Sequence, residues 1–252
     1  MPDRSPSSGQ RKDYDYDYDY DSRGLNTCEN QQREGDQTVS STESDAGHWD
    51  ASHIAHLLAV YRDGLLSDTL PFWLDRCVDH QHGGFMFMRD RDGSLLDTDK
   101  GVWQQGRFTW MLGELFNQVE RRPEWLEAAL HGGRFLEEHC FDPADGRMWF
   151  HVTREGQPIR KRRYAYSETF AAVAFGELAQ ATGDSRWAER AQAAFARFLD
   201  HHRHSPEVSS KFTGTRPSIG IGIPMITIVT AQQLRESIDL QEANLLIDQS
   251  ID

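Results

Sequence analysis

Four side chains that could bind a sugar are spaced so that they share one face of a helix. Trp103, Arg107, Trp110 and Glu114 follow one another at intervals of four, three and four residues. Residues at these spacings are neighbours on a helix surface. Indole rings pack on the C–H faces of a sugar, and guanidinium and carboxylate groups form hydrogen bonds with its hydroxyl groups. A buried helix whose Arg107 and Glu114 pair with neighbouring elements would show the same spacing, so both interpretations stay open.

A second candidate pair, Ser167 and Glu168, opens the helix expected over residues 167–182. Ser167 suits the N-cap position, and Glu168 in the first turn favours the positive end of the helix dipole. A carboxylate at the mouth of a cavity can also bind a substrate hydroxyl or orient a base. Together, Glu114 and Glu168 would supply the two carboxylates that a glycoside hydrolase or lyase requires.

One strongly basic run, Arg160-Lys161-Arg162-Arg163, leads into that helix. Such a run can capture a phosphate or a nucleotide, but it is more often a solvated edge. We therefore expect a solvated edge in which Arg163 is the member that points inward.

Histidines give weaker signals. His80 and His82 lie in a run that resembles half of a metal site, but no partner cluster has matching spacing, so we prefer turn chemistry ahead of a hairpin. The histidines within residues 201–204 are expected in solvent at a helix end. No Gly-rich phosphate loop, nucleophile elbow or HExxH zinc motif is present, so no metal site is predicted.

Helices must position these side chains, and apolar spacings of three and four residues predict them from Trp49 onward. The expected ranges are 51–77 in two amphipathic stretches, 102–120, 123–140, 167–182, 185–203 and 219–236, with another helix starting near Leu240. Pro123 fits a first helical position, Gly183 a C-terminal cap and Asp184 the next N-cap. Residues 84–96 and 147–159 read as β-hairpins around an acid-glycine turn.

An internal repeat gives the architecture. The sequences that begin at Arg91, Gly113 and Arg134 recur 63 residues later, at Arg154, Gly176 and Arg197. One offset for three separated matches implies a repeated unit of hairpin, helix and helix. Because each such unit hides only part of its apolar surface, the units must stack side by side. The fold class is therefore all-α: an α/α solenoid or toroid of helical hairpins with short β-hairpin loops.

Composition bounds the remaining possibilities. The 252 residues carry 27 Lys and Arg against 40 Asp and Glu, a net charge of −13, which disfavours nucleic acid as a partner. Residues 1–47 are rich in Ser, Gly, Asp and Gln and predict a disordered acidic tail, leaving 48–252 as the folded domain. No apolar stretch is long enough to span a membrane, and no secretory signal is visible. With three widely spaced cysteines, we expect a cytoplasmic protein.

Four landmarks in the folded domain resemble the N-acylglucosamine 2-epimerase family, also called the renin-binding protein family. The first two are residues 79–85, DHQHGGF, and residues 97–110, which contain Trp-Gln-Gln-Gly-Arg. The third is Tyr-Ser-Glu-Thr-Phe at 166–170 with Glu177-Leu178 and Ala181-Thr182-Gly183. The fourth runs from Pro224-Met225 to Gln233-Leu234.

The resemblance implies an (α/α)6 toroid, of which this chain holds about the first half, and the interconversion of 2-epimeric sugars such as N-acetylglucosamine and N-acetylmannosamine. It makes Arg107 an active-site residue that stabilises developing enediolate charge, and Glu168 a carboxylate at the mouth. The substrate-binding candidates beside them are Trp103, Gln104, Trp110 and Ser167. In the family, one histidine removes the C2 proton and a second returns it, so no metal or organic cofactor is expected.

The family places those histidines in the second half of the toroid, the first in a Gly-His segment followed three residues later by glutamate. This sequence contains no such segment. We therefore expect a sugar 2-epimerase chain that is truncated and inactive alone, with a small sugar as its partner. The alternatives are another aldose epimerase or aldose-ketose isomerase, acting on mannose or cellobiose, and a non-catalytic fragment that binds a sugar or a protein. Apolar faces left unpaired in half a toroid favour a homodimer.

Overall fold

The computed structural model describes residues 50–162, 164–204, 215 and 220–251. The expected tail, residues 1–47, and the inward-pointing role of Arg163 lie outside the described residues. The described helices are α1 (Ala51–Leu57), α2 (Leu70–Cys77), α3 (Val102–Glu114), α4 (Pro123–His139), α5 (Tyr166–Thr182), α6 (Ser185–His204), α7 (Gly222–Ile238) and α8 (Ala243–Ile251). Three π-helical segments are η1 (Leu58–Asp63), η2 (Leu65–Thr69) and η3 (Leu115–Val119).

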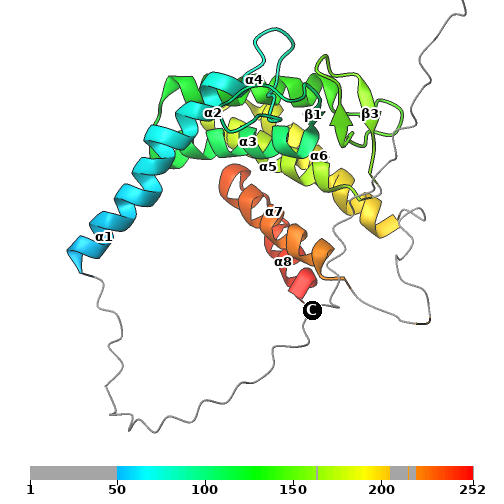
Figure 1. The fold of residues 1–252 in the computed structure, drawn as a ribbon. Coiled ribbons are helices and arrows are strands. Elements are labelled where there is room, and N and C mark those ends of the chain that lie inside the picture. The colour runs from blue at the N-terminus through cyan, green and yellow to red at the C-terminus, as the bar shows by residue number, and fades with distance from the viewer. Residues whose placement is uncertain (1–49, 163, 205–214, 216–219, 252) are drawn as a thin grey trace, which may run out of the picture. The chain divides into compact units, whose positions relative to one another are not determined.

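The helices from α3 to α8 alternate between two layers. Helix α5 packs against α3 on one side and α7 on the other, and each of these three packs against the helix that follows it in the chain, α4, α6 or α8. Figure 1 shows α3 and α5 side by side, and α7 and α8 running as a pair in orange and red. Helix α5 is buried along most of its length, as an inner helix must be. This is the stacked helical-hairpin arrangement that the repeat predicts.

Local signals set the helix ends much as expected. Pro123 occupies the first helical position of α4, and Gly183 ends α5 in the left-handed region with φ 72°. Asp184 accepts a hydrogen bond from the Arg186 backbone N–H at 2.9 Å, which caps the start of α6. Ser167 is not an N-cap, because α5 begins one residue earlier than expected and its N-cap is Ala165.

The N-terminal helical run, residues 51–77, is continuous, although we expected two stretches. It passes through η1 and η2 without leaving helical backbone angles at Gly64. Figure 1 shows α1 extending away from the layers formed by α3 to α6. The apolar residues Ile54 in α1 and Leu58 and Tyr61 in η1 are exposed to 48%, 44% and 72%, so this part of the helical run has no described partner.

A small sheet joins the hairpins to the inner helices. Strands β1 (Lys100–Gly101), β2 (His151–Val152) and β3 (Pro158–Arg160) form one antiparallel sheet in that order. The hairpin expected over 147–159 is confirmed, with Gly156 at φ 86° in its turn. The expected 84–96 hairpin is reduced to a single bridge, Arg89 with Leu95. The pairing of β1 with β2 was not expected from the sequence.

Two glycines allow the inner helices to approach closely. A Cβ added to Gly106 would lie 2.8 Å from the Cβ of Phe170 on α5, and one added to Gly113 would lie 2.6 Å from the Cβ of Glu177. Both distances are shorter than side chains tolerate, so glycine is required at both places. The backbones of α3 and α5 are thereby held side by side.

Candidate active site

A cavity of about 320 Å³ lies between the inner helices α3, α5 and α7. Most of its lining is apolar, with a few polar side chains, which is usual for a small-molecule site. The lining residues are Arg107, Trp110, Thr169, Phe170, Val173, Ile226, Val229, Thr230 and Gln233. The structure therefore brings two predicted site residues, Arg107 and Trp110, into one cavity.

The three helices contribute equivalent positions. The 63-residue offset of the repeat relates Arg107 to Phe170 and Trp110 to Val173, and all four line the cavity. The buried leucines Leu178 and Leu234 set the next offset at 56 residues, which relates Phe170, Val173 and Glu177 to Ile226, Val229 and Gln233. The cavity wall is thus a set of matching layers on neighbouring repeat units.

Arg107 is the cationic group of the cavity. Its guanidinium carbon lies 4.9 Å from the centre of the Phe170 ring, a cation–π contact that orients it. No carboxylate lines the cavity, and Arg107 forms no ion pair among the described residues. The five N–H donors of the guanidinium are therefore available to oxygen atoms of a ligand.

Trp110 bridges two inner helices. Its indole Nε1 donates a hydrogen bond to Oε1 of Gln233 on α7, at 2.9 Å. This bond fixes the indole against the cavity, where a ring face can pack on the C–H groups of a sugar.

Trp103 packs against Phe170, one of the residues that line the cavity. Its ring lies 5.7 Å from Phe170, 5.8 Å from Tyr166 and 5.1 Å from Phe150, measured between centres. It does not line the cavity. Trp103 therefore fixes the Phe170 ring on which Arg107 rests, and the expected stacking of Trp103 on a sugar is not what this geometry provides.

Gln104 and Ser167, the other predicted substrate-binding residues, also lie outside the cavity lining. Gln104 is exposed and its side chain folds back toward Gly101. Ser167 is 4% exposed within the first turn of α5. On these two helices the lining begins further along, at Arg107 on α3 and at Thr169 on α5.

Glu168 is placed differently from the expectation. Its side chain is fully buried, and Oε1 accepts a hydrogen bond from the Met148 backbone N–H at 2.8 Å. The Arg147 guanidinium lies 3.5 Å away. Burial raises the pKa of Glu168, although the Met148 N–H opposes the shift. The carboxyl anchors the loop after α4 to α5 and is not at a cavity mouth, so it does not form a glycosidase pair with Glu114.

This placement gives a prediction for Glu168. Glu168→Gln retains an oxygen that can accept from the Met148 N–H, so we expect a small loss of stability and unchanged sugar affinity. Glu168→Ala leaves that buried N–H unpaired and should cost about 1–3 kcal/mol of unfolding free energy. Thermal denaturation and sugar titration of both variants measure these effects. Loss of sugar binding in a folded Glu168→Gln variant would restore the direct role that we expected from the sequence.

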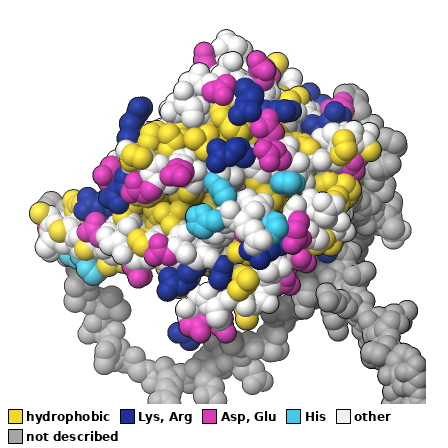
Figure 2. Space-filling model, turned by 90° about the horizontal axis from the view of Figure 1, so that it is seen from above, with side chains coloured by type: hydrophobic (Ala, Val, Ile, Leu, Met, Phe, Trp, Pro, Cys, Tyr) yellow, Lys and Arg dark blue, Asp and Glu magenta, His cyan; other side chains and the backbone are white. Residues whose placement is uncertain are grey.

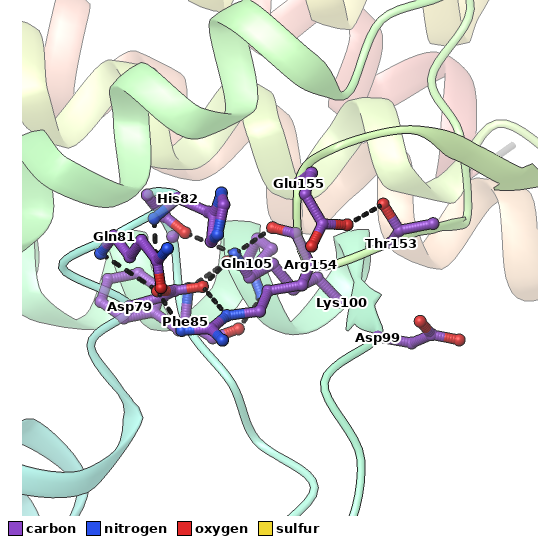
Figure 3. Close-up of polar contacts among 12 residues, drawn as sticks. Asp79, Gln81, His82, Phe85, Asp99, Lys100, Gln105, Thr153, Arg154 and Glu155 are labelled. Atoms are coloured by element: carbon purple, nitrogen blue, oxygen red, sulfur yellow. Dashed lines mark hydrogen bonds and ion pairs between the residues drawn. The ribbon is translucent and has the colours of Figure 1, made fainter.

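A buried charge cluster centred on Asp79 fixes the start of α3. Lys100 Nζ donates to Asp79 Oδ2 at 3.0 Å, and the Arg154 guanidinium donates to both carboxylate oxygens at 2.9 and 3.0 Å. Figure 3 shows these two side chains converging on Asp79. Lys100 also donates to the carbonyls of Gly83 and Arg154, both at 2.6 Å. Because Lys100 lies in β1, which directly precedes α3 in the chain, the cluster sets the direction of the helix that carries Arg107.

More than half of the chain matches a known protein family. Residues 83–218 match the family model described as N-acylglucosamine 2-epimerase (GlcNAc 2-epimerase). The chain belongs to the N-acylglucosamine 2-epimerase family. It is 35% identical to the N-acylglucosamine 2-epimerase of Bos taurus over 177 residues, which cover 68% of this chain and 42% of that protein. It is 29% identical to the cellobiose 2-epimerase of Bacteroides fragilis, over 56% of this chain and 35% of that protein. The chain thus spans less than half the length of these relatives.

Solved structures show the same fold as this family member. The cellobiose 2-epimerase of Bacillus thermoamylovorans superposes with a TM-score of 0.69 at 19% identity, over 79% of this chain and 55% of that one. A D-mannose isomerase superposes with a TM-score of 0.63 at 16% identity, over 76% and 49%. The α/α fold class expected from the repeat is confirmed, as is the (α/α)6 toroid with short β-hairpin loops that the family resemblance implied, of which this chain holds part. None of the described helices is long and apolar enough to cross a membrane.

The basic run of this epimerase-family chain is not the solvated edge that we expected. The Arg162 guanidinium lies 4.0 Å from the centre of the Phe150 ring, and Arg160 lies 5.4 Å from the same ring. Lys161 pairs with Asp142 at 2.6 Å. All three side chains are half-buried, because aromatic rings and acids beside β3 cover them.

The histidines also differ in part from expectation. Figure 2 shows several histidine side chains gathered on one face of the molecule, but no group of three or more metal-binding side chains occurs among the described residues. Asp79 accepts hydrogen bonds from the backbone N–H groups of Gln81 and His82, which confirms the turn. His201 is 7% exposed and not in solvent. His202 lies against Phe198, and burial lowers its pKa to about 4.

Sequence reasoning missed most of the cavity wall. Phe170 and Val173 carried a usable signal, because the repeat offset relates them to Arg107 and Trp110. Residues of α7 did not, because the third unit follows the second at a different offset. Apolar residues such as Ile226 and Val229 also have the spacing of ordinary core residues, so the sequence does not distinguish them from the core.

Two acidic residues, Glu114 on α3 and Glu177 on α5, lie close together near the cavity. Glu177 is 3% exposed, and Asn117 Nδ2 donates to its Oε2 at 2.7 Å. Burial raises the pKa of Glu177, Asn117 opposes the shift, and the nearby Glu114 and Glu236 charges raise it further, to about 8. The Glu177 carboxyl is thus protonated near neutrality.

This pair predicts a pH-dependent stability. The pKa of Glu177 in the folded chain, about 8, exceeds the ordinary value of 4.5, so ionisation destabilises the fold progressively as pH rises from about 4.5 to 8. Glu177→Gln keeps an acceptor for Asn117 and cannot ionise. We expect the Tm of this variant, relative to the unmodified chain, to rise across that pH window and to level off above it. A constant Tm difference from pH 4.5 to 9 would contradict a buried, protonated Glu177 at neutral pH.

Proposed function

We propose that this chain binds the open-chain sugar of a 2-epimerisation reaction in the cavity between α3, α5 and α7. Arg107 carries the proposal, because it is a cation held on Phe170 in a cavity of sugar size whose described lining residues include no carboxylate. Its relatives named N-acylglucosamine 2-epimerase support N-acetylglucosamine and N-acetylmannosamine as the pair of substrates.

The chemistry of that reaction matches what Arg107 can supply. Removing the C2 proton of an open-chain aldose places negative charge on the O1 oxygen as an enediolate forms. A guanidinium beside O1 stabilises this charge more in the transition state than in the ground state. Two groups must then exchange a proton with the opposite faces of C2. The described lining residues include no histidine or carboxylate, so the proposed contribution of this cavity is binding and charge stabilisation.

Binding and C2 exchange together test this function. The chain is titrated calorimetrically with N-acetylmannosamine, N-acetylglucosamine, mannose and cellobiose, and the proton NMR signal of C2–H is followed in D2O. Saturable binding accompanied by loss of that signal supports an epimerase. Saturable binding with the C2–H signal retained favours the alternative of a non-catalytic sugar-binding fragment. No saturable binding of any of the four sugars contradicts the proposal.

Two further expectations belong with this proposal. A cytoplasmic location is supported by Cys77 and Cys140, which are buried free thiols. A homodimer is supported by exposed apolar residues, among them Tyr61 in η1, Ile221 directly before α7 and Ile251 at the end of α8, at 72%, 75% and 69%. Light scattering after size exclusion measures the oligomeric state directly.

A further inference from the structure

Gln233 is held in one orientation by its neighbour. An indole N–H can only donate a hydrogen bond, so Trp110 Nε1 must face the Oε1 atom of Gln233, as it does at 2.9 Å. The other end of the amide, Nε2, then has two hydrogens to donate. No residue in the described part of the chain accepts them, and Gln233 lines the cavity.

The position of Gln233 sets it apart from its equivalents. On α3 and α5 the residue that precedes the buried leucine is an acid, Glu114 or Glu177, whereas on α7 it is Gln233. A carboxylate at this position would have no hydrogen to donate. The amide therefore adds a donor to a cavity wall whose described residues include no carboxylate.

Apart from the Thr230 hydroxyl, which also lines the cavity, the surroundings of this donor are apolar or already committed. Val173, Ile226 and Val229 contribute the neighbouring wall. The Thr169 hydroxyl donates to the Tyr166 carbonyl at 2.9 Å, so its hydrogen is used within α5. A ligand group that suits this corner accepts hydrogen bonds without donating and carries apolar bulk. An acyl group meets both conditions, because its carbonyl oxygen accepts and its methyl group is apolar.

We propose that Gln233 is a specificity-determining residue that donates its amide hydrogens to the acyl carbonyl of an N-acylated sugar, while Trp110 holds it in place. The inference rests on the proposed sugar-binding function. Arg107 then binds the reacting end of the open-chain sugar, and Gln233 distinguishes an N-acetylated sugar from one with a hydroxyl at C2.

Calorimetric titration with N-acetylmannosamine and with mannose tests the assignment in the full chain. We expect the unmodified chain to bind N-acetylmannosamine about tenfold more tightly than mannose, the effect of one hydrogen bond lost from a desolvated site. Gln233→Glu retains an acceptor for Trp110 but replaces the donor, so it should abolish the preference and bring the two affinities to within about twofold of each other. Gln233→Leu should do the same and also shift the tryptophan emission. Gln232→Leu, at the exposed neighbouring position on α7, is the matched control and should keep the preference.

Each outcome decides between the two proposals. A folded Gln233→Glu variant that keeps the full preference overturns the role of Gln233 and leaves the sugar site standing. Equal affinity of the unmodified chain for N-acetylmannosamine and mannose also overturns the role of Gln233 and leaves the sugar site standing. Failure to bind either sugar overturns the sugar site itself, and the role of Gln233 with it.

Discussion

Replacing Arg107 with alanine is expected to weaken sugar binding at least tenfold without unfolding the chain. The guanidinium is exposed, forms no ion pair among the described residues and rests on the Phe170 ring. Its loss should therefore change the unfolding free energy by about 1 kcal/mol at most. If the unmodified chain exchanges the C2 proton of the sugar, removing the Arg107 guanidinium, which stabilises the enediolate oxygen, should slow that exchange by about 10²–10³-fold. Calorimetry, NMR exchange in D2O and thermal denaturation measure the three quantities.

Arg122→Ala provides the matched control for this variant. Arg122 also lies over an aromatic ring, with its guanidinium carbon 4.7 Å from the centre of Trp125, but it lies outside the cavity. We expect normal sugar affinity and normal exchange for Arg122→Ala. An Arg107→Ala variant that binds and exchanges as well as this control would refute the role given to Arg107.

The largest expected effect on stability comes from Asp79. Burial alone would raise the pKa of this carboxyl, but hydrogen bonds from Arg154 and Lys100 outweigh it and hold the pKa well below its usual range. Asp79→Asn leaves two cationic side chains without their counter-charge, and Lys100 is completely buried. Removing one partner of a buried ion pair costs about 3–5 kcal/mol. Chemical denaturation should therefore show a large fall in unfolding free energy.

The pH dependence of this effect has a definite sign. A carboxyl whose pKa is lowered by folding stabilises the fold above its unfolded pKa, near 3.8, and loses that contribution as pH falls below it. The difference between the unmodified chain and Asp79→Asn should shrink below about pH 4. As a control, Asp145→Asn removes a carboxylate that is 48% exposed and pairs with Lys161, and it should cost about 1 kcal/mol or less. Equal stability losses for Asp79→Asn and Asp145→Asn would show that the buried cluster is not what fixes α3.

The sequence contained most of the architecture because the relevant signals are local or periodic. Pro123 and Gly183 determine helix ends through their own backbone preferences, and the 63-residue repeat requires neighbouring units to stack. These signals do not depend on knowing which parts of the chain meet. The amino-acid sequence alone therefore predicts the helices and their alternation.

The site was only partly predictable, because helical spacing does not say which neighbour a face meets. Arg107 and Trp110 face the cavity, while Trp103, on the same stripe, turns toward Phe150 and Tyr166. Glu168 looked suitable for a cavity mouth, but the loop that carries Met148 covers it. Arg162 looked solvated, but Phe150 lies against it. In each case a residue distant in the sequence decided the outcome.

A crystal structure of the chain in complex with N-acetylmannosamine tests the central claim most directly. The account predicts that the sugar occupies the cavity between α3, α5 and α7, with one of its oxygens within about 3.2 Å of the Arg107 guanidinium. A sugar bound at another surface, or one in the cavity that leaves Arg107 without a contact, would contradict it.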